Sequence, residues 1–153
     1  MFLYRVVKAL EAQRVRYAIV GGYAVALHGA VRGTVDLDLV LALDRAAFLG
    51  AEKAFSALGL KARLPVTGGE VFDFRKEYLE KRNLVAWSFS HPDNALEVID
   101  VILTHDARKM KVVRVKSGDV VLKVASIPDL IEMKTASGRP QDVEDVKALR
   151  KLL

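Results

Sequence analysis

The sequence predicts one α/β domain, a mixed β-sheet with helices packed against it and a helical segment at the C-terminus. Three observations predict it: an amphipathic helical pattern at the start, several short β-rich runs bounded by turns, and thirty final residues with helical signals. The 153 residues are 52% hydrophobic and 28% charged, which is enough for a core. We expect a single domain over 1–153, with its core over about 1–124 and C-terminal helices over about 126–153.

The first half of the chain alternates helical and strand patterns. Apolar residues recur at helical spacing near the N-terminus, and glycines follow several of the periodic segments, where they are typical of turns and helix ends. The expected elements are a helix over 2–13, a strand over 17–20, a short helix over 23–28, a strand over 34–43 and a helix over 45–58.

The second half is richer in strand patterns before it becomes helical. Ser126 and the following Pro128 are typical of a helix start, and Ser137-Gly138-Arg139-Pro140 breaks that helix. The expected elements are strands over 60–64, 83–88, 95–103, 112–115 and 120–124, a charged helix near 71–81, and two C-terminal helices on either side of the break.

Composition indicates the compartment and the kind of partner. The chain has no cysteine and no apolar run long enough for a membrane helix. Arg5 and Lys8 interrupt the apolar N-terminus, which a secretory signal does not do. We therefore expect a soluble cytoplasmic protein with no membrane partner.

A net charge of +5 favours polyanionic partners such as nucleotides or RNA. Six cationic residues against two aspartates lie between His105 and Lys123. They form either a phosphate-facing strip or a solvated face of a hairpin.

Two aspartates, Asp36 and Asp38, fall in the expected strand over 34–43. Side chains of a strand alternate between faces, so both carboxylates are expected on one side, about 7 Å apart. Two neighbouring carboxylates repel each other unless a cation lies between them, and hard divalent ions prefer oxygen ligands. The pair therefore predicts a magnesium-type site.

Gly21-Gly22 lies at a turn from strand to helix. Backbone N–H groups without side chains beside them can approach an anion at such a turn. A phosphate cradle some fourteen residues before an Asp-x-Asp pair is what binding of a metal–triphosphate requires, although each feature alone is commonly a turn or a solvated edge.

A third carboxylate is expected from Asp100, which interrupts an apolar strand. A charge on a buried strand costs several kcal/mol unless it is paired or bound to metal. Glu97, on the opposite face of that strand, is the second choice, and a solvated strand end is the structural alternative for Asp100. Lys134 continues an apolar helix stripe, so it either neutralises triphosphate charge or extends from the stripe to solvent.

The histidines show no zinc-site spacing, and no P-loop or dinucleotide-binding motif is present. The informative residues occur instead in two blocks joined by one acid. They are Gly21-Gly22, Arg32, Thr34, Asp36-Leu37-Asp38 and Asp100, followed by 129–134 with Lys134, and by Arg139, Asp142 and Asp145.

This pattern resembles the nucleotidyltransferase superfamily with the DNA polymerase β-like core, most nearly its AbiEii-type and related small bacterial members. The resemblance implies transfer of a nucleoside monophosphate from an NTP to an acceptor hydroxyl of a tRNA, a protein or a small molecule. It also implies two Mg²⁺ ions, which Mn²⁺ can replace, and a role in a toxin–antitoxin or resistance system.

The resemblance also implies roles for individual residues. Asp36, Asp38 and Asp100 would be the metal ligands and catalytic acids, and Gly21, Gly22, Arg32, Thr34 and Lys134 would bind the nucleotide. Many members have Gly-Ser in place of the two glycines, so only backbone donors are left here. Arg139, Asp142 and Asp145 are expected chiefly to tie the last helices to the core.

The alternative to an active enzyme is a non-catalytic nucleotide- or partner-binding module with the same fold. The short chain has no evident acceptor-binding domain, which favours a small acceptor, a partner protein or a homodimer. An RNA-binding protein without enzymatic activity is a third hypothesis, and only the basic charge favours it.

Overall fold

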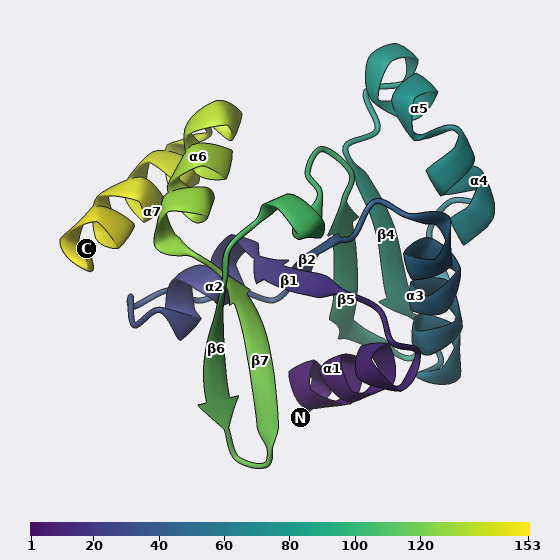
Figure 1. The fold of residues 1–153 in the computed structure, drawn as a ribbon, viewed down its shortest axis with the longest axis horizontal. Helices are drawn as coiled ribbons and strands as arrows, with labels where there is room; N and C mark the ends of the chain where they lie inside the picture. The colour runs from purple at the N-terminus through teal and green to yellow at the C-terminus, as the bar shows by residue number, and fades with distance from the viewer.

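A seven-stranded mixed sheet with helices packed against it forms the body of the computed structural model, which describes all residues 1–153 (Figure 1). The strand order is β3-β4-β5-β2-β1-β7-β6. At the centre, β2 (Leu37–Leu41) runs parallel to β5 (Asn94–Ile102) and antiparallel to β1 (Tyr17–Val20). The predicted fold class is therefore confirmed.

The outer strands extend this centre on both sides. β4 (Ala86–His91) pairs antiparallel with β5, and the short β3 (Lys61–Ala62) pairs with β4. On the other side β7 (Val120–Ala125) runs parallel to β1 and forms an antiparallel hairpin with β6 (Val112–Ser117).

Two amphipathic helices, α1 (Phe2–Ala12) and α3 (Arg45–Ala57), pack against each other and bury their apolar sides in the core. The side chain of Asp44 caps α3 by accepting a hydrogen bond from Ala47 N. Beneath the helices lies an aromatic group in which the Phe48 and Trp87 rings stack 5.8 Å apart.

Three further helices gather at the carboxyl end of β1. α2 (Gly21–Leu27) follows β1 directly and contacts β2, β7 and α6 (Ile127–Ser137). α6 and α7 (Pro140–Lys151) lie side by side as a pair (Figure 1). As predicted, Ser126 caps α6, by accepting a hydrogen bond from the backbone N–H of Asp129.

Several predicted boundaries are wrong, and the pairing of strands explains the most important one. The strand predicted over 34–43 is shortened to β2, because β1 pairs with it only from Val20 opposite Asp38 and then turns into α2. Thr34 and Asp36 therefore lie before the strand. The short helix begins at Gly21 rather than at residue 23.

The helix predicted near 71–81 is two helices, α4 (Gly68–Asp73) and α5 (Arg75–Lys81). A capping box of Thr67 and Glu70 starts α4 early. Gly68, the first residue of α4, packs so closely that a Cβ there would lie 2.7 Å from the Phe48 carbonyl oxygen. The other differences are shifts of strand ends and a short 3₁₀ helix, η1 (Ala107–Lys109). No helix combines the length and apolar composition that crossing a membrane requires.

Candidate functional site

Asp38 and Asp100 are direct register partners across the parallel strands β2 and β5. Paired residues of neighbouring strands point to the same face, so these two carboxylates share one face of the sheet. Ser88, opposite Asp100 on β4, donates a hydrogen bond from its hydroxyl to Asp100 Oδ1 at 2.6 Å. Sequence reasoning missed Ser88, and the only signal was a serine alternating with aromatic residues along β4.

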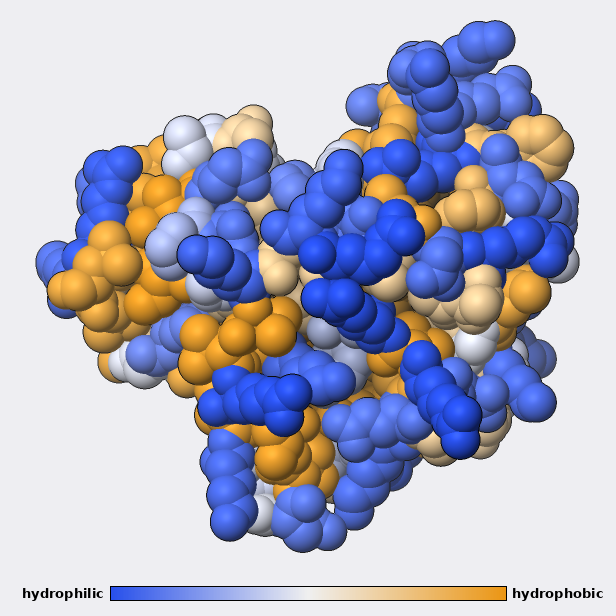
Figure 2. Space-filling view, viewed as in Figure 1, coloured by the Kyte–Doolittle hydropathy of each residue, from blue (hydrophilic) through white to orange (hydrophobic).

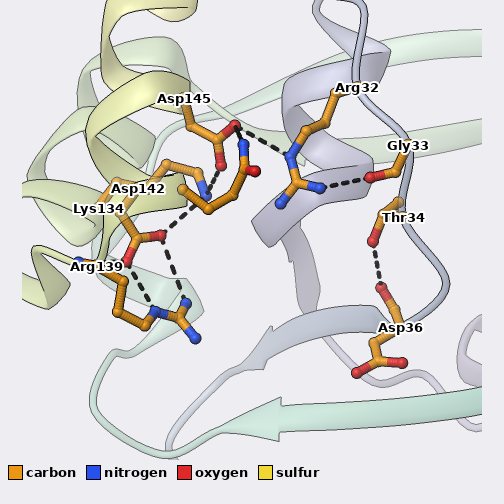
Figure 3. Close-up of polar contacts among 9 residues, drawn as sticks. Arg32, Gly33, Thr34, Asp36, Lys134, Arg139, Asp142 and Asp145 are labelled. Atoms are coloured by element: carbon orange, nitrogen blue, oxygen red, sulfur yellow. Dashed lines mark hydrogen bonds and ion pairs between the residues drawn. The ribbon is translucent and has the colours of Figure 1, made fainter.

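Asp36 is placed differently from the prediction. It occupies a bend directly before β2 and is exposed, whereas Leu37 and Leu39 enter the core as expected. The Thr34 hydroxyl donates a hydrogen bond to the Asp36 carbonyl oxygen at 3.3 Å, which shapes this bend (Figure 3).

The pKa of Asp38 is raised to about 7, chiefly by burial and in addition by the negative charges of Asp100 and Asp36. Lys134 and Arg139 act in the opposite direction through their positive charges. Asp100 and Asp36 therefore both lie close enough to Asp38 for their charges to act on it.

The two glycines at the start of α2 are required by close packing. Gly21 has φ +69°, and a Cβ there would lie 2.1 Å from Asp38 Oδ2. A Cβ on Gly22 would lie 2.9 Å from Thr34 Oγ1 and 3.2 Å from the Arg32 guanidinium carbon. The glycines therefore let the turn lie directly against Asp38 and Thr34, a steric role that sequence reasoning did not foresee.

Lys134 is buried in an ion cluster between α6 and α7. Its Nζ donates to Asp145 Oδ2 at 2.7 Å and lies 3.6 Å from Asp142 Oδ1. Arg32 reaches the same cluster from the loop before β2, with Nε donating to Asp145 Oδ1 at 3.0 Å (Figure 3). Lys134 therefore does not extend to solvent, and Asp145 links the helix pair to the loop that carries Thr34 and Asp36.

Arg139 and Asp142 complete this cluster at the start of α7. The Asp142 carboxylate accepts hydrogen bonds from the Arg139 backbone at 3.1 Å and from its Nε at 2.9 Å. Burial opposes ionisation of Asp145, but hydrogen bonds from Lys134 and Gln141 outweigh burial and keep the pKa of Asp145 below its usual range. These contacts fit the structural role proposed for the segment 139–145.

Other candidates lie away from this site. Glu97 points to the opposite face of β5, where it pairs with Arg5 on α1 at 2.6 Å. The histidines are dispersed: His28 contacts the Ala125 carbonyl oxygen at 2.8 Å, and His105 pairs with Glu132 at 3.1 Å.

The donor set at the candidate site suits a hard divalent cation. None of Asp36, Asp38 and Asp100 forms an ion pair with a side chain, and carboxylate oxygens are the ligands that Mg²⁺ accepts. No three acidic or histidine side chains form a closed ligand cluster, and Asp36 lies outside the strand that carries Asp38. Asp38 and Asp100 therefore make up the core of the site.

The sheet order and the helices around it define the class: a nucleotidyltransferase-like fold. No protein-family model matches the sequence, and the curated proteins contain no match to it. Solved structures match nearly the whole chain at 13–16% identity, a level at which the likeness defines the fold.

Three of these structures are of adenylyl-transferring enzymes or of a nucleotidyltransferase-like protein. The lincosamide antibiotic adenylyltransferase LnuA, bound to lincomycin, has a TM-score of 0.64 and 14% identity, covering 99% of this chain and 96% of its own. An antigenic nucleotidyltransferase-like protein from Paracoccidioides brasiliensis has a TM-score of 0.63 and 16% identity, covering 98% and 74%. ANT(2'')-Ia in complex with adenylyl-2''-tobramycin has a TM-score of 0.61 and 13% identity, covering 96% and 84%.

Proposed function

We propose that this protein is a metal-dependent nucleotidyltransferase that moves a nucleoside monophosphate from an NTP to an acceptor hydroxyl. The observation that carries the proposal is the direct pairing of Asp38 with Asp100, next to the glycine turn that Gly21 opens. Carboxylates without an ion-pair partner next to a glycine turn support the proposal, because binding of a metal–triphosphate requires acidic ligands beside phosphate-binding backbone groups.

Asp36, Asp38 and Asp100 would hold Mg²⁺, with two ions in the complete site and Mn²⁺ as a substitute. Bound metal would neutralise charge on the triphosphate and lower the pKa of the acceptor hydroxyl. Asp36, which is exposed in the bend, is the ligand with the freedom to adjust its position.

The chain's own residues would position the substrates and accept a proton. Asp100, held by the Ser88 hydroxyl, would accept the proton of the acceptor hydroxyl. The acceptor oxygen attacks the α-phosphorus, the bond between the α-phosphorus and the bridging oxygen breaks, and pyrophosphate leaves. Gly21 and Gly22 would present backbone N–H groups to the outer phosphates.

Arg32, Thr34 and Lys134 would support the nucleotide from around the turn. Thr34 packs against Gly22, while Arg32 and Lys134 share Asp145. Lys134 would therefore act through its charge from within the cluster, as it already does on Asp38.

A small-molecule hydroxyl is the acceptor class that the named solved structures favour, since two of them are bound to lincomycin or to an adenylylated tobramycin. A role in resistance follows from that acceptor. RNA or protein acceptors, as in a toxin–antitoxin system of the AbiEii type, are the alternatives, and a homodimer or partner protein could complete the acceptor site.

The experiment is transfer of label from each of four α-labelled NTPs, with Mg²⁺, to host RNA, protein or small molecules. The wild type should label one acceptor class, and Asp36→Asn/Asp38→Asn should not. Glu97→Gln is the matched control, because this acid lies on the other face of β5. Nucleotide binding without labelling by any NTP would favour the non-catalytic module instead.

A further inference from the structure

A groove of about 430 Å³ opens between the start of β1 and the β6–β7 hairpin. β1 and β7 pair at Ile19 and Val124, and beyond this contact the hairpin extends away from β1 (Figure 1). We call this the basic groove, and its charged lining consists of Arg14, Arg16, Arg114, Lys123 and the one acid Glu11.

The cations of the basic groove are not neutralised within the protein. Arg14, Arg16 and Arg114 are exposed and form no ion pair, and Lys123 lies 5.8 Å from the centre of the Tyr17 ring without a carboxylate partner. The cations near the candidate site differ, because Arg32, Lys134 and Arg139 are each paired with an aspartate. The basic groove therefore keeps its charge for an external anion.

Strand register adds a second observation. Arg114 on β6 lies directly opposite Lys123 on β7, and like charges facing each other across two strands are destabilising. Lys116, two residues after Arg114, extends the row on the same side of the strand. In Figure 2, strongly hydrophilic side chains lie over this hairpin among apolar ones. An anion lying between the walls would relieve the repulsion.

The lining favours an extended chain of phosphates over a protein partner. Of the three apolar lining residues, Val15 and Tyr17 are 4% and 1% exposed, and only Val112, at 40%, offers apolar surface. One exposed valine is neither the apolar centre of a protein interface nor a ring for base stacking. Because cations lie on both walls and along the hairpin, they suit a ligand with a row of negative charges rather than a single phosphate group. We infer that the basic groove binds the phosphodiester backbone of a nucleic acid strand.

This inference goes beyond the proposed transferase activity and does not depend on it. The groove adjoins Tyr17 at the start of β1, whereas Asp38 pairs with Val20 at the end of that strand. The two sites are therefore about 10 Å apart along the strand, so they can be altered separately.

The test is fluorescence anisotropy with single-stranded 20-nucleotide RNA and DNA of one sequence, at several salt concentrations. With four phosphate contacts, log K should fall against log salt with a slope of about −3. Arg114→Gln/Lys123→Gln should make the slope shallower by about 1.4 and weaken binding roughly 25-fold at about 0.1 M salt.

Controls use the protein itself. Lys76→Gln/Lys81→Gln on α5 removes the same charge far from the groove (Figure 1) and should bind as the wild type does. Arg14→Gln/Arg16→Gln, on the opposite wall, should reproduce the groove defect if the first variant folds poorly. Asp36→Asn/Asp38→Asn should not weaken nucleic acid binding, which separates this inference from the transferase proposal.

Two results would overturn the inference. One is binding by both groove variants that equals the wild type at every salt concentration. The other is an equal loss in the α5 control, because binding would then follow net charge rather than the groove. RNA and DNA should show the same slope, since backbone contacts do not distinguish their sugars.

Discussion

Asp38 combines three conditions at one residue of the sheet. It is largely buried, it faces a second aspartate in direct register, and a glycine at φ +69° packs against its carboxylate. The pKa of about 7 expresses the free energy that ionisation costs here in the absence of a cation.

This condition predicts a stability that depends on pH. The fold favours the protonated Asp38, so its contribution is complete below about pH 4 and is lost as the pH rises through about 7. In metal-free buffer, Asp38→Asn should exceed the wild type in free energy of unfolding by up to about 4 kcal/mol at pH 8. Urea denaturation from pH 4 to 8 measures it, and a difference that does not change with pH would contradict the assignment.

Gly21 gives a second prediction at this scale. Gly21→Ala would put a methyl group against the Asp38 carboxylate and force a side chain into the left-handed region, so it should cost at least about 2 kcal/mol. Gly33→Ala is the matched control, because a Cβ there meets nothing within 4 Å, and it should change stability by less than about 0.5 kcal/mol. Chemical denaturation compares the two, and equal losses would refute the packing argument.

At the scale of elements, the ion cluster of Lys134, Asp142 and Asp145 holds α6 against α7 and ties both to the loop before β2. A buried charge left without its partner costs several kcal/mol, whereas an exposed pair contributes little. The cluster therefore sets the position of the loop that carries Asp36.

Removal of one member tests this role. Asp145→Ala should lower the free energy of unfolding by about 3 kcal/mol, because Lys134 and Arg32 lose their shared partner. Asp73→Ala breaks the exposed pair with Arg45 and should cost less than about 1 kcal/mol. Thermal and urea unfolding of both variants check the contrast; similar losses would assign the cluster no special role.

Sequence patterns predicted the elements better than their ends. The apolar period of α1 and the N-cap at Ser126 are local signals, and both predictions are confirmed. The predicted bounds of β2 were wrong because a strand extends only as far as its neighbours pair with it. The local sequence carries no information about that pairing. The break between α4 and α5 falls at Phe74, where no proline or glycine signals it in the sequence.

At the scale of the whole molecule, sequence patterns predicted Asp38 and Asp100 as site residues on two strands, and the parallel pairing of β2 with β5 puts both on one face. Contacts between distant segments could not be predicted in this way. The hydrogen bond from Ser88 and the partners of Lys134 depend on which strands and helices become neighbours. The basic groove likewise joins residues 14 and 16 to residues 114 and 123.

The whole molecule thus presents two surfaces of opposite charge. Unpaired carboxylates gather at the carboxyl end of β1, and unpaired cations line the groove at its start. The central claim is that a divalent cation and an NTP bind at the first surface. A ligand that binds only the native state raises the free energy of unfolding.

Thermal unfolding with and without Mg²⁺ and an NTP tests this claim most directly. The wild type and Glu97→Gln should gain about 2.7 kcal/mol at a hundredfold excess of ligand over Kd, seen as a rise of several degrees in Tm. Asp36→Asn/Asp38→Asn should show no rise above its own ligand-free Tm. Equal rises in all three proteins would contradict a metal site built on these aspartates.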